Sequence, residues 1–354
     1  MRTEPIMSTS KSKWRKILLI AFAVLAVPAA FGVYWFWKIY YRPGTHTGDE
    51  KGVFYVHTGT TYNQLVDALE TKHIIDSRKD FEWTAELKKF KEPKPGRYRV
   101  REGMTYRELI NMFSAGLQEP VNITFNTVRT KKDLAHQVSR YLECDSLELI
   151  TLLQDDSFAA KYGFTGETFL TMFIPDTYEF YWNTSADEFF QRMADEYKKF
   201  WTDERKAKAR DAGLTQSEVS VLASIVESEQ RYDVAERKII AGLYLNRIKK
   251  GMKLESDPTV IYAIGDFSIR RVLKADLQYE SPYNTYLHSG LPPGPILLPE
   301  KSSIDAVLNY DHNNYIYMCA EYGTGKHLFT ADYNQHLRNA QKFRTALDKA
   351  GIKN

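Results

Sequence analysis

The chain has 354 residues, of which 43% are hydrophobic and 26% charged, and a formal net charge of +3. This composition is typical of a folded protein of about two or three domains and excludes extended disorder. Because the net charge is small and no long basic run follows the N-terminus, no nucleic-acid partner is expected.

The first feature is an apolar segment at 17–37, ILLIAFAVLAVPAAFGVYWFW, which carries no charge. A helix that crosses a bilayer needs about 20 such residues. Basic residues precede the segment within 1–16, and Trp35 and Trp37 stand where interfacial aromatic residues are common. A cleaved signal peptide is the alternative, but its apolar region usually runs only about 7–15 residues. We therefore expect a retained single-pass anchor in the inner membrane, with 1–16 in the cytoplasm and the rest of the chain outside.

Residues 38–51 form a polar linker, and the region 52–118 that follows contains an internal repeat. The pattern Val-x-x-Gly-x-Thr-Tyr-x-x-Leu at 56–65 returns at 100–109. Such self-similarity indicates a supersecondary unit used twice. Each copy predicts a short strand, a glycine turn and a helix that begins at the threonine. The pattern resembles the start of a LysM module, a small glycan-binding unit, and leaves open whether the region contacts glycan or only orients the rest of the chain.

Residues 119–205 form a connecting α+β region in which no single element carries recognisable chemistry. It includes strand-like VNITFNTV, helical KDLAHQVSRYLE and the segment FIPDTYEFYW at 173–182, where a turn enters an aromatic strand. From 206 onward, helices alternate with loops rich in Pro, Gly and Asn. Functional residues usually concentrate in such loops, so we expect the active site in this last region.

The segment VLASIVESEQ at 221–230 is an apolar run that ends in two glutamates. Thr215 and Glu218 have the spacing of a capping box, which predicts that a helix begins just before this run. The sequence Asp-Val-Ala-Glu at 233–236 repeats the spacing and predicts a second helix that ends near Gly251.

The helical period gives these two glutamates different surroundings. At 100° per residue, Glu227 is expected at the edge of the core, above the small side chains of Ser220, Ala223 and Ser224, whereas Glu229 falls near the apolar stripe. The two carboxylates are either simply solvated, or one is a general acid whose pKa is raised by partial burial. The period alone does not choose between them.

Two later stretches predict loops, and none of the usual spacings predicts a metal or cofactor. The stretch 281–300 holds five prolines and two glycines, which exclude a regular helix and favour a rigid loop that walls a cleft. GTGK at 323–326 lacks the first glycine of a phosphate-binding loop and predicts a turn. The cysteines, Cys144 and Cys319, match no metal or redox spacing. We expect no metal and no cofactor.

Several segments together are similar to the endolytic murein transglycosylases of the YceG-like (MltG) family: LASIVESE, LNRIKKGMKLESDPTVIYAIG, SPYNTY, GLPPGPI and HLFTADYNQH. Their order and spacing match over about 219–336, and PDTYEF, the LysM-like region and the single anchor also fit. The resemblance implies an α+β fold with a catalytic domain at 206–347. The chain departs from the family at Glu255, Leu298 and Glu300, where Gln, Asn and Gly are common.

The resemblance also implies a reaction, which is cleavage of the MurNAc–GlcNAc β-1,4 bond of peptidoglycan without hydrolysis. It places the catalytic acid at Glu227, which would protonate the leaving glycosidic oxygen. The MurNAc C6 hydroxyl would then attack C1 and give a 1,6-anhydro end, so that neither a second carboxylate nor a metal is required. Other motif positions are expected to line or shape the cleft and bind substrate: Glu229, Asn246, Asp257, Tyr283, Asn284 and Thr285.

Two other functions stay open at this stage. One is a lysozyme-like hydrolase that pairs Glu227 with Glu229, Glu255 or Asp257, and the other is an anchored cell-wall-binding protein without activity. For the transglycosylase, the resemblance implies a role in ending glycan elongation. Its partners would be peptidoglycan glycan strands, the inner membrane and peptidoglycan synthases.

Overall fold

The computed structural model describes residues 10–48, 52–125 and 128–350, so the predicted cytoplasmic segment lies largely outside the described residues. The expected α+β class is confirmed, because helices predominate and the described strands form three two-stranded sheets. The chain separates into two compact units, which are Met1–Val121 with Tyr181–Asn183 and Asn122–Phe180 with Thr184–Asn354. The predicted boundary at 206 stays a prediction.

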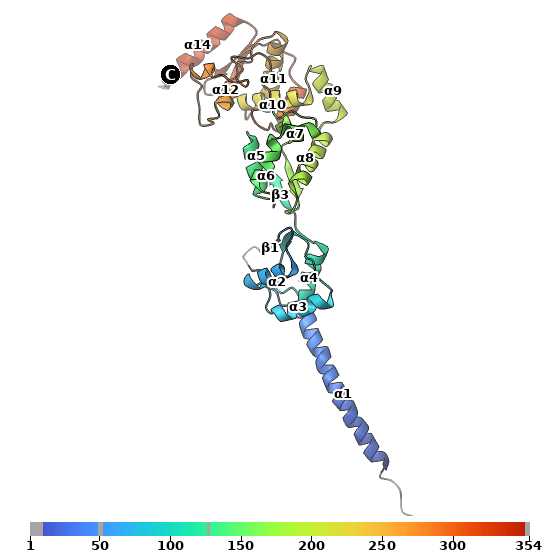
Figure 1. The fold of residues 1–354 in the computed structure, drawn as a ribbon. Helices are drawn as coiled ribbons and strands as arrows, with labels where there is room; N and C mark the ends of the chain where they lie inside the picture. Colours follow the sequence, from blue (N-terminus) through green and yellow to red (C-terminus); the bar gives the residue numbers. More distant parts are fainter. Residues whose placement is uncertain (1–9, 49–51, 126–127, 351–354) are drawn as a thin grey trace, which may run out of the picture. The chain divides into compact units, whose positions relative to one another are not determined.

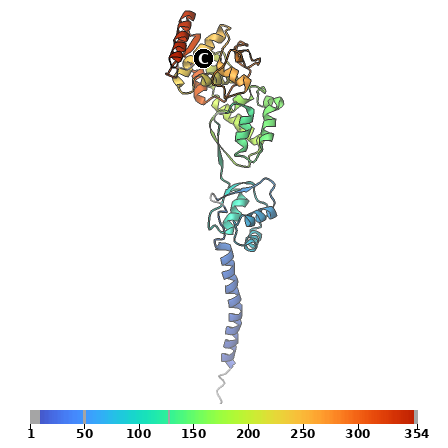
Figure 2. The same cartoon turned by 90° about the vertical axis from the view of Figure 1, so that its left-hand side faces the viewer.

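The elements of the first unit are α1 (Ser10–Tyr41), β1 (Val53–Val56), α2 (Tyr62–Thr71), α3 (Arg78–Leu87), β2 (Gly96–Arg99) and α4 (Tyr106–Ala115). The helix α1 runs without interruption in both views (Figure 1, Figure 2). It contains the predicted span 17–37, and its part Trp14–Tyr41 is long and apolar enough to cross a membrane. The large apolar side chains along it are exposed, which suits a lipid environment.

The predicted repeat is confirmed in the first unit. β1 and β2 pair antiparallel, with Val53 opposite Arg99. α2 and α4 both begin at a threonine whose hydroxyl accepts a backbone N–H three residues on, and both have the reciprocal side-chain bond of a capping box. The leucines of the two copies, Leu65 and Leu109, are buried in one core.

A shallow cavity of about 350 Å³ lies at the glycine turn of the first copy and is lined in part by Tyr55 and His57. The ring of Trp182, which belongs to the same unit, lies 4.8 Å from the ring of Tyr55 and 5.0 Å from that of His57. Three rings therefore gather beside this cavity.

The elements of the second unit are β3 (Val121–Thr124), α5 (Lys131–Ser139), α6 (Ser146–Gln154), α7 (Asp156–Lys161), η1 (Phe169–Met172), β4 (Thr177–Phe180), α8 (Ala186–Phe200), α9 (Asp203–Asp211), α10 (Gln216–Glu229), α11 (Val234–Lys249), α12 (Asp257–Ile264), η2 (Asp276–Gln278), α13 (Lys301–Leu308), β5 (Tyr317–Glu321), β6 (Lys326–Thr330) and α14 (Tyr333–Lys349). β3 pairs with β4, and β5 and β6 form an antiparallel hairpin. The GTGK segment makes its turn, as predicted. α10 contacts α9, α11, α12 and α13 and lies within the main core.

The stretch 281–300 contains no helix or strand, as its prolines predict. Hydrogen bonds fix this loop to distant segments. The Ile296 N–H donates to the Ser224 hydroxyl over 3.1 Å, and the Leu298 N–H donates to the Val128 carbonyl over 2.8 Å. The loop is thereby held against both α10 and the chain near β3.

Gly294 of this loop lies against the Glu167 backbone. A Cβ at position 294 would come within 2.3 Å of the Glu167 carbonyl oxygen, a distance that real Cβ atoms do not adopt. Glycine is therefore required for the close approach of these two backbones.

Candidate active site

The helix α10 begins and ends where local sequence signals place it. The Thr215 hydroxyl accepts the Glu218 N–H, and the Glu218 carboxylate accepts the Thr215 N–H over 2.7 Å, which completes the predicted capping box. After Glu229 the backbone becomes extended at Gln230. The Asp233 side chain then caps α11, as its spacing predicts. Both glutamates thus lie on the last turn of a short helix.

From Val219 to Val226 the helix is buried on all sides rather than along one stripe. Ser220, Ala223 and Ser224, the small residues above which Glu227 is predicted to lie, are fully buried together with the apolar residues. The reason is that α11, α13 and the proline-rich loop surround α10. Glu227 reaches open space because it is the first residue after the buried stretch.

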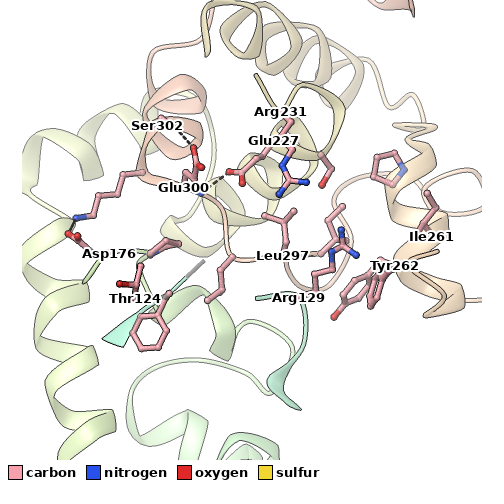
Figure 3. Close-up of a pocket in the computed structure, with 18 of the residues that line it drawn as sticks. Thr124, Arg129, Asp176, Glu227, Arg231, Ile261, Tyr262, Leu297, Glu300 and Ser302 are labelled. Carbon is pink, nitrogen blue, oxygen red and sulfur yellow. Dashed lines mark hydrogen bonds and ion pairs between the residues drawn. The ribbon is translucent and has the colours of Figure 1, made fainter. Parts of the chain in front are cut away.

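Glu227 lines a cavity of about 650 Å³, and its two carboxyl oxygens differ (Figure 3). Oε2 accepts the Glu300 N–H and the Ser303 hydroxyl, each over 2.7 Å. Within the described part of the chain, Oε1 has no hydrogen-bond partner. One oxygen is therefore held by the protein, and the other is available to a ligand.

Burial raises the pKa of Glu227 above its usual value, since the ionised form is poorly solvated there. The Ser303 hydroxyl and the Glu300 N–H act in the opposite direction, because they stabilise the ionised form, and so does the charge of Arg237. The Glu300 carboxylate raises the pKa further by repulsion. The net direction is the one expected for a general acid at neutral pH.

Five stretches of chain form the walls of this cavity. Aromatic and aliphatic side chains make up much of the surface, and charged groups interrupt it at several points. The lining residues are Thr124, Phe125, Arg129, Pro175, Asp176, Thr177, Glu227, Ser228, Arg231, Pro258, Ile261, Tyr262, Phe267, Ile269, Ile296, Leu297, Leu298, Glu300, Lys301 and Ser302.

Three cationic side chains line this cavity, at Arg129, Arg231 and Lys301. Lys301 forms an ion pair with Asp176 across the wall, and this contact lowers the pKa of Asp176. The guanidinium of Arg129 lies over the ring of Phe267, 4.5 Å from its centre. Figure 3 shows Arg231 beside Glu227. The cavity can therefore offer positive charge to an anionic ligand.

Glu229 lines a different cavity, of about 620 Å³. The hydroxyls of Tyr244 and Ser256 both donate to its Oε1, the first over 2.8 Å. Burial raises the pKa of Glu229 as well, against the opposing effect of these two donors. The two glutamates thus share a helix end but not a site.

Asp257 and Glu255 also line this second cavity. The Tyr286 hydroxyl donates to Asp257 Oδ1 over 2.7 Å, and the Arg247 guanidinium pairs with the Glu255 carboxylate over 2.9 Å. Each of these carboxylates therefore has its own partner, and neither lines the cavity of Glu227.

The remaining predicted site residues hold loops. Asn246 donates to two backbone carbonyls after α13, and Asn284 donates to two carbonyls of the η2 segment. The Thr285 hydroxyl accepts the backbone N–H that precedes α12. The Tyr283 ring lies 4.8 Å from that of Tyr262, which does line the first cavity. Among the described residues, these four predicted side chains support walls rather than line the Glu227 cavity.

Sequence reasoning missed the groups that surround Glu227. Arg129 and Asp176 come from the connecting region, where no element carried recognisable chemistry by itself. Ser303 and Arg237 gave no signal either, because a serine and an arginine in helices are common. The segment PDTYEF was the one available sign, since it matched the family pattern and contains Asp176.

Comparisons with known proteins show the family to which the chain is related. A model of the YceG-like family matches residues 54–342. An endolytic murein transglycosylase of Bacillus subtilis (strain 168) is 27% identical over 304 residues, which are 81% of this chain and 83% of that protein. Another, from Streptococcus pneumoniae (strain ATCC BAA-255 / R6), is 26% identical over 320 residues, or 79% of this chain and 56% of that protein. The chain thus spans just over half the length of the streptococcal relative.

A solved structure is similar in fold. The crystal structure of a YceG-like protein from Listeria monocytogenes has a TM-score of 0.56 and 23% sequence identity. The similarity covers 81% of this chain and 97% of that one.

Proposed function

The chain belongs to the YceG-like family, and we propose that it is an endolytic murein transglycosylase, a lyase that cleaves MurNAc–GlcNAc β-1,4 bonds in peptidoglycan glycan strands. One observation carries the proposal: the carboxyl of Glu227 has a raised pKa, one oxygen held by two donors and the other free in a cavity. The murein transglycosylases among its relatives support the reaction class.

In the proposed reaction Glu227 acts first as acid and then as base. Its protonated carboxyl donates to the glycosidic oxygen as the bond from that oxygen to C1 of MurNAc breaks. The C6 hydroxyl of the same MurNAc forms the new bond to C1, and its proton passes to the Glu227 carboxylate. The products are a new GlcNAc 4-hydroxyl and a 1,6-anhydro-MurNAc end, and the enzyme returns to its starting state.

The cavity of Glu227 suits a sugar that carries carboxylates. Its volume of about 650 Å³ falls within the range of ligand sites, which is roughly 300–1,000 Å³. Tyr262 and Phe267 offer flat apolar surface, and Arg129 and Arg231 offer positive charge. We propose that any contact of Glu229 and Asp257 with substrate is confined to the second cavity, and that Asn246, Tyr283, Asn284 and Thr285 act by holding the loops.

The separation of the two cavities disfavours a hydrolase that pairs Glu227 with Glu229, Glu255 or Asp257. A glycosidase needs its two carboxyl groups on either side of one bond, about 5–10 Å apart. Glu229, Glu255 and Asp257 line the second cavity, away from the open space beside Glu227. In the transglycosylase mechanism the substrate supplies the nucleophile, so one carboxyl suffices.

We propose that α1 anchors the enzyme in the inner membrane, with the N-terminus in the cytoplasm and the chain from about residue 38 outside. The support is the exposed apolar surface of α1 and the basic residues that precede its apolar stretch 17–37. From this position the enzyme would meet nascent strands and peptidoglycan synthases and end elongation. Protease added to spheroplasts should degrade the chain beyond residue 52, and protection of that region would contradict the orientation.

For the LysM-like region 52–118 we propose contact with glycan, through the rings of Tyr55, His57 and Trp182 beside the shallow cavity. Trp182→Ala should weaken binding to purified sacculi, while cleavage of short soluble glycans continues. Unchanged binding to sacculi would leave the region with an orienting role only.

The reaction itself is tested by digesting purified sacculi and analysing the fragments. We expect 1,6-anhydro-MurNAc ends on fragments of internal length, which is the mark of an endolytic lyase. Reducing MurNAc ends would instead indicate the hydrolase. Binding to sacculi without any cleavage, under conditions in which a known transglycosylase is active, would indicate the binding protein.

A further inference from the structure

Arg237 is a buried arginine that ties the end of α10 to the start of α13. Its side chain is 2% exposed. Nε donates to the Gln230 carbonyl over 2.8 Å, and Nη2 donates to the Arg231 carbonyl over 2.6 Å. Nη1 donates to the Ser303 hydroxyl over 2.7 Å and to the Ser302 hydroxyl over 2.9 Å. A guanidinium has donors and no acceptor, so each of these contacts has a fixed direction.

This direction determines what the Ser303 hydroxyl can do. A serine hydroxyl has one proton to donate. Since its oxygen must accept from Arg237, that proton is left for the second neighbour, which is Oε2 of Glu227 at 2.7 Å. Ser303 therefore acts as a fixed donor toward Glu227.

The other neighbour of Oε2 is also a donor. The backbone N–H of Glu300 points to it over 2.7 Å. A proton on Oε2 would face both donors, whereas Oε2 as a carbonyl oxygen accepts from both. The neutral carboxyl of Glu227 is consequently more stable with its proton on Oε1, the oxygen that has no partner in the described part of the chain.

We propose that Arg237, acting through Ser303, directs the acidic proton of Glu227 onto Oε1, where the glycosidic oxygen would lie. Arg237 and Ser303 are positioning residues. The inference rests on the proposed function for its catalytic meaning, but the location of the proton is a property of the folded protein alone.

Several charged groups face Glu227 from the elements around it and bear on its pH dependence. Arg237 comes from α11, Glu300 and Lys301 from the start of α13, and Arg231 from the segment after α10. Asp176, which precedes β4, is neutralised by its pair with Lys301. Ser303 also contacts Glu227 but is uncharged, so its replacement leaves the net charge around Glu227 unchanged.

Infrared spectroscopy of the full-length protein in detergent tests the proton location directly. At a pH low enough to protonate Glu227, the spectrum of the protein minus that of Glu227→Gln isolates the C=O stretch of this carboxyl. For Ser303→Ala, the spectrum of Ser303→Ala/Glu227→Gln is subtracted in the same way. The band should then lie at higher frequency than in the wild-type protein, because the carbonyl oxygen Oε2 has lost one of its two hydrogen-bond donors. If the proton is on Oε2, the carbonyl is Oε1 and the band stays in place, which would overturn the proposal.

Ser302→Ala is the matched control. Its hydroxyl also accepts from Arg237, but it donates to the Glu300 carboxylate and does not contact Glu227. In Ser302→Ala, the C=O band of Glu227 should stay at the wild-type frequency. Arg237→Gln, if folded, should shift the band as Ser303→Ala does, because an amide can also accept and frees the serine proton to turn away. A folded Arg237→Gln with the wild-type band would leave the arginine without the proposed role.

The pH profile of sacculus cleavage gives the catalytic readout. In Ser303→Ala, kcat/KM should fall about tenfold, an effect typical of one hydrogen bond to an ionisable group. Loss of this donor raises the pKa of Glu227, so the alkaline limb should move to higher pH. An unmoved limb together with an unmoved band would reject the proposal. If wild type does not cleave sacculi at all, the proposed function fails, and the infrared bands still decide where the proton lies.

Discussion

Two glutamates at the end of one helix, Glu227 and Glu229, occupy two different cavities. Burial raises the pKa of both. Two residues along a helix correspond to a turn of about 200°, so their side chains leave on nearly opposite sides. A raised pKa therefore does not by itself identify the acid, and the surroundings of each carboxyl must decide.

The two carboxyls differ in their hydrogen-bond donors. Glu227 accepts from a backbone N–H and from the Ser303 hydroxyl, both fixed by the fold. Glu229 accepts on one oxygen from two side-chain hydroxyls, in a cavity that holds two further carboxylates, Glu255 and Asp257. Each carboxyl therefore has one oxygen held by two donors and one without a partner among the described residues. The cavity of Glu227 also holds two further carboxylates, Asp176 and Glu300, so the difference lies in the donors, which include a backbone N–H only at Glu227.

The largest expected effect is that of Glu227→Gln, compared with Glu229→Gln. General acid–base catalysis contributes about 10²–10⁴-fold, so sacculus cleavage by Glu227→Gln should fall by that factor while the fold is kept. Glu229→Gln should cost less, because it disturbs only the support of the helix end. The measurement is anhydro-MurNAc released per enzyme, with circular dichroism as the folding control. If both variants lost the same fraction of their activity, the proposal that only the cavity of Glu227 holds the reacting bond would be wrong.

The next effect comes from filling each cavity with a large side chain. Leu297→Trp should reduce cleavage by about 10²-fold, a loss comparable to that caused by small misplacements of a substrate. Cys319→Trp places the same ring in the second cavity and should leave most of the activity. If Cys319→Trp were as harmful as Leu297→Trp, with both proteins folded, the reacting bond would have to extend into the second cavity.

A smaller effect concerns pH. The Glu300 carboxylate raises the pKa of Glu227 by repulsion, so Glu300→Gln should lower it. Because the acid must be protonated to act, the alkaline limb of kcat/KM should move to lower pH, opposite to the shift expected for Ser303→Ala. Glu255→Gln, at the other cavity, is the control and should leave the limb in place. A limb that does not move in Glu300→Gln would show that this charge is screened.

The smallest effect is on stability and belongs to Glu229. Its pKa is raised in the folded state, so it contributes stability that is fully present below its unfolded pKa of about 4.3 and is lost as pH rises through the folded pKa. Glu229→Gln has no such proton. In urea unfolding from pH 4 to 8, the variant should therefore gain stability relative to wild type as pH rises. A constant difference over this range would place the pKa of Glu229 near its ordinary value.

Short sequence patterns, such as those of helix caps, predicted many of the secondary-structure elements correctly. The threonines at 61, 105 and 215 cap their helices as predicted, because capping depends on residues only three positions apart. The helical period also separated Glu227 from Glu229 correctly. It could not predict that Ser220 and Ser224 are buried, because burial of that side depends on packing by α13 and a loop that lie about 75 residues further along the chain.

The site beyond Glu227 could not be predicted from the residues alone. Ser303 lies 76 positions from Glu227 and Arg237 lies 66 from Ser303, and nothing in their local sequence marks these contacts. Asn284 and Thr285 stood in a motif, but a motif does not distinguish a residue that touches a ligand from one that holds a loop. Their buried hydrogen bonds make that distinction only in three dimensions.

The contact of Gly294 with the Glu167 carbonyl has a consequence for sequence drift. Any side chain at 294 would force apart two backbones that hold the proline-rich loop in place, and with it Ile296 and Leu297 on the wall of the Glu227 cavity. Leu297 itself is less constrained, because its side chain meets open space. The position of this wall thus depends on a residue that contributes no side chain to it.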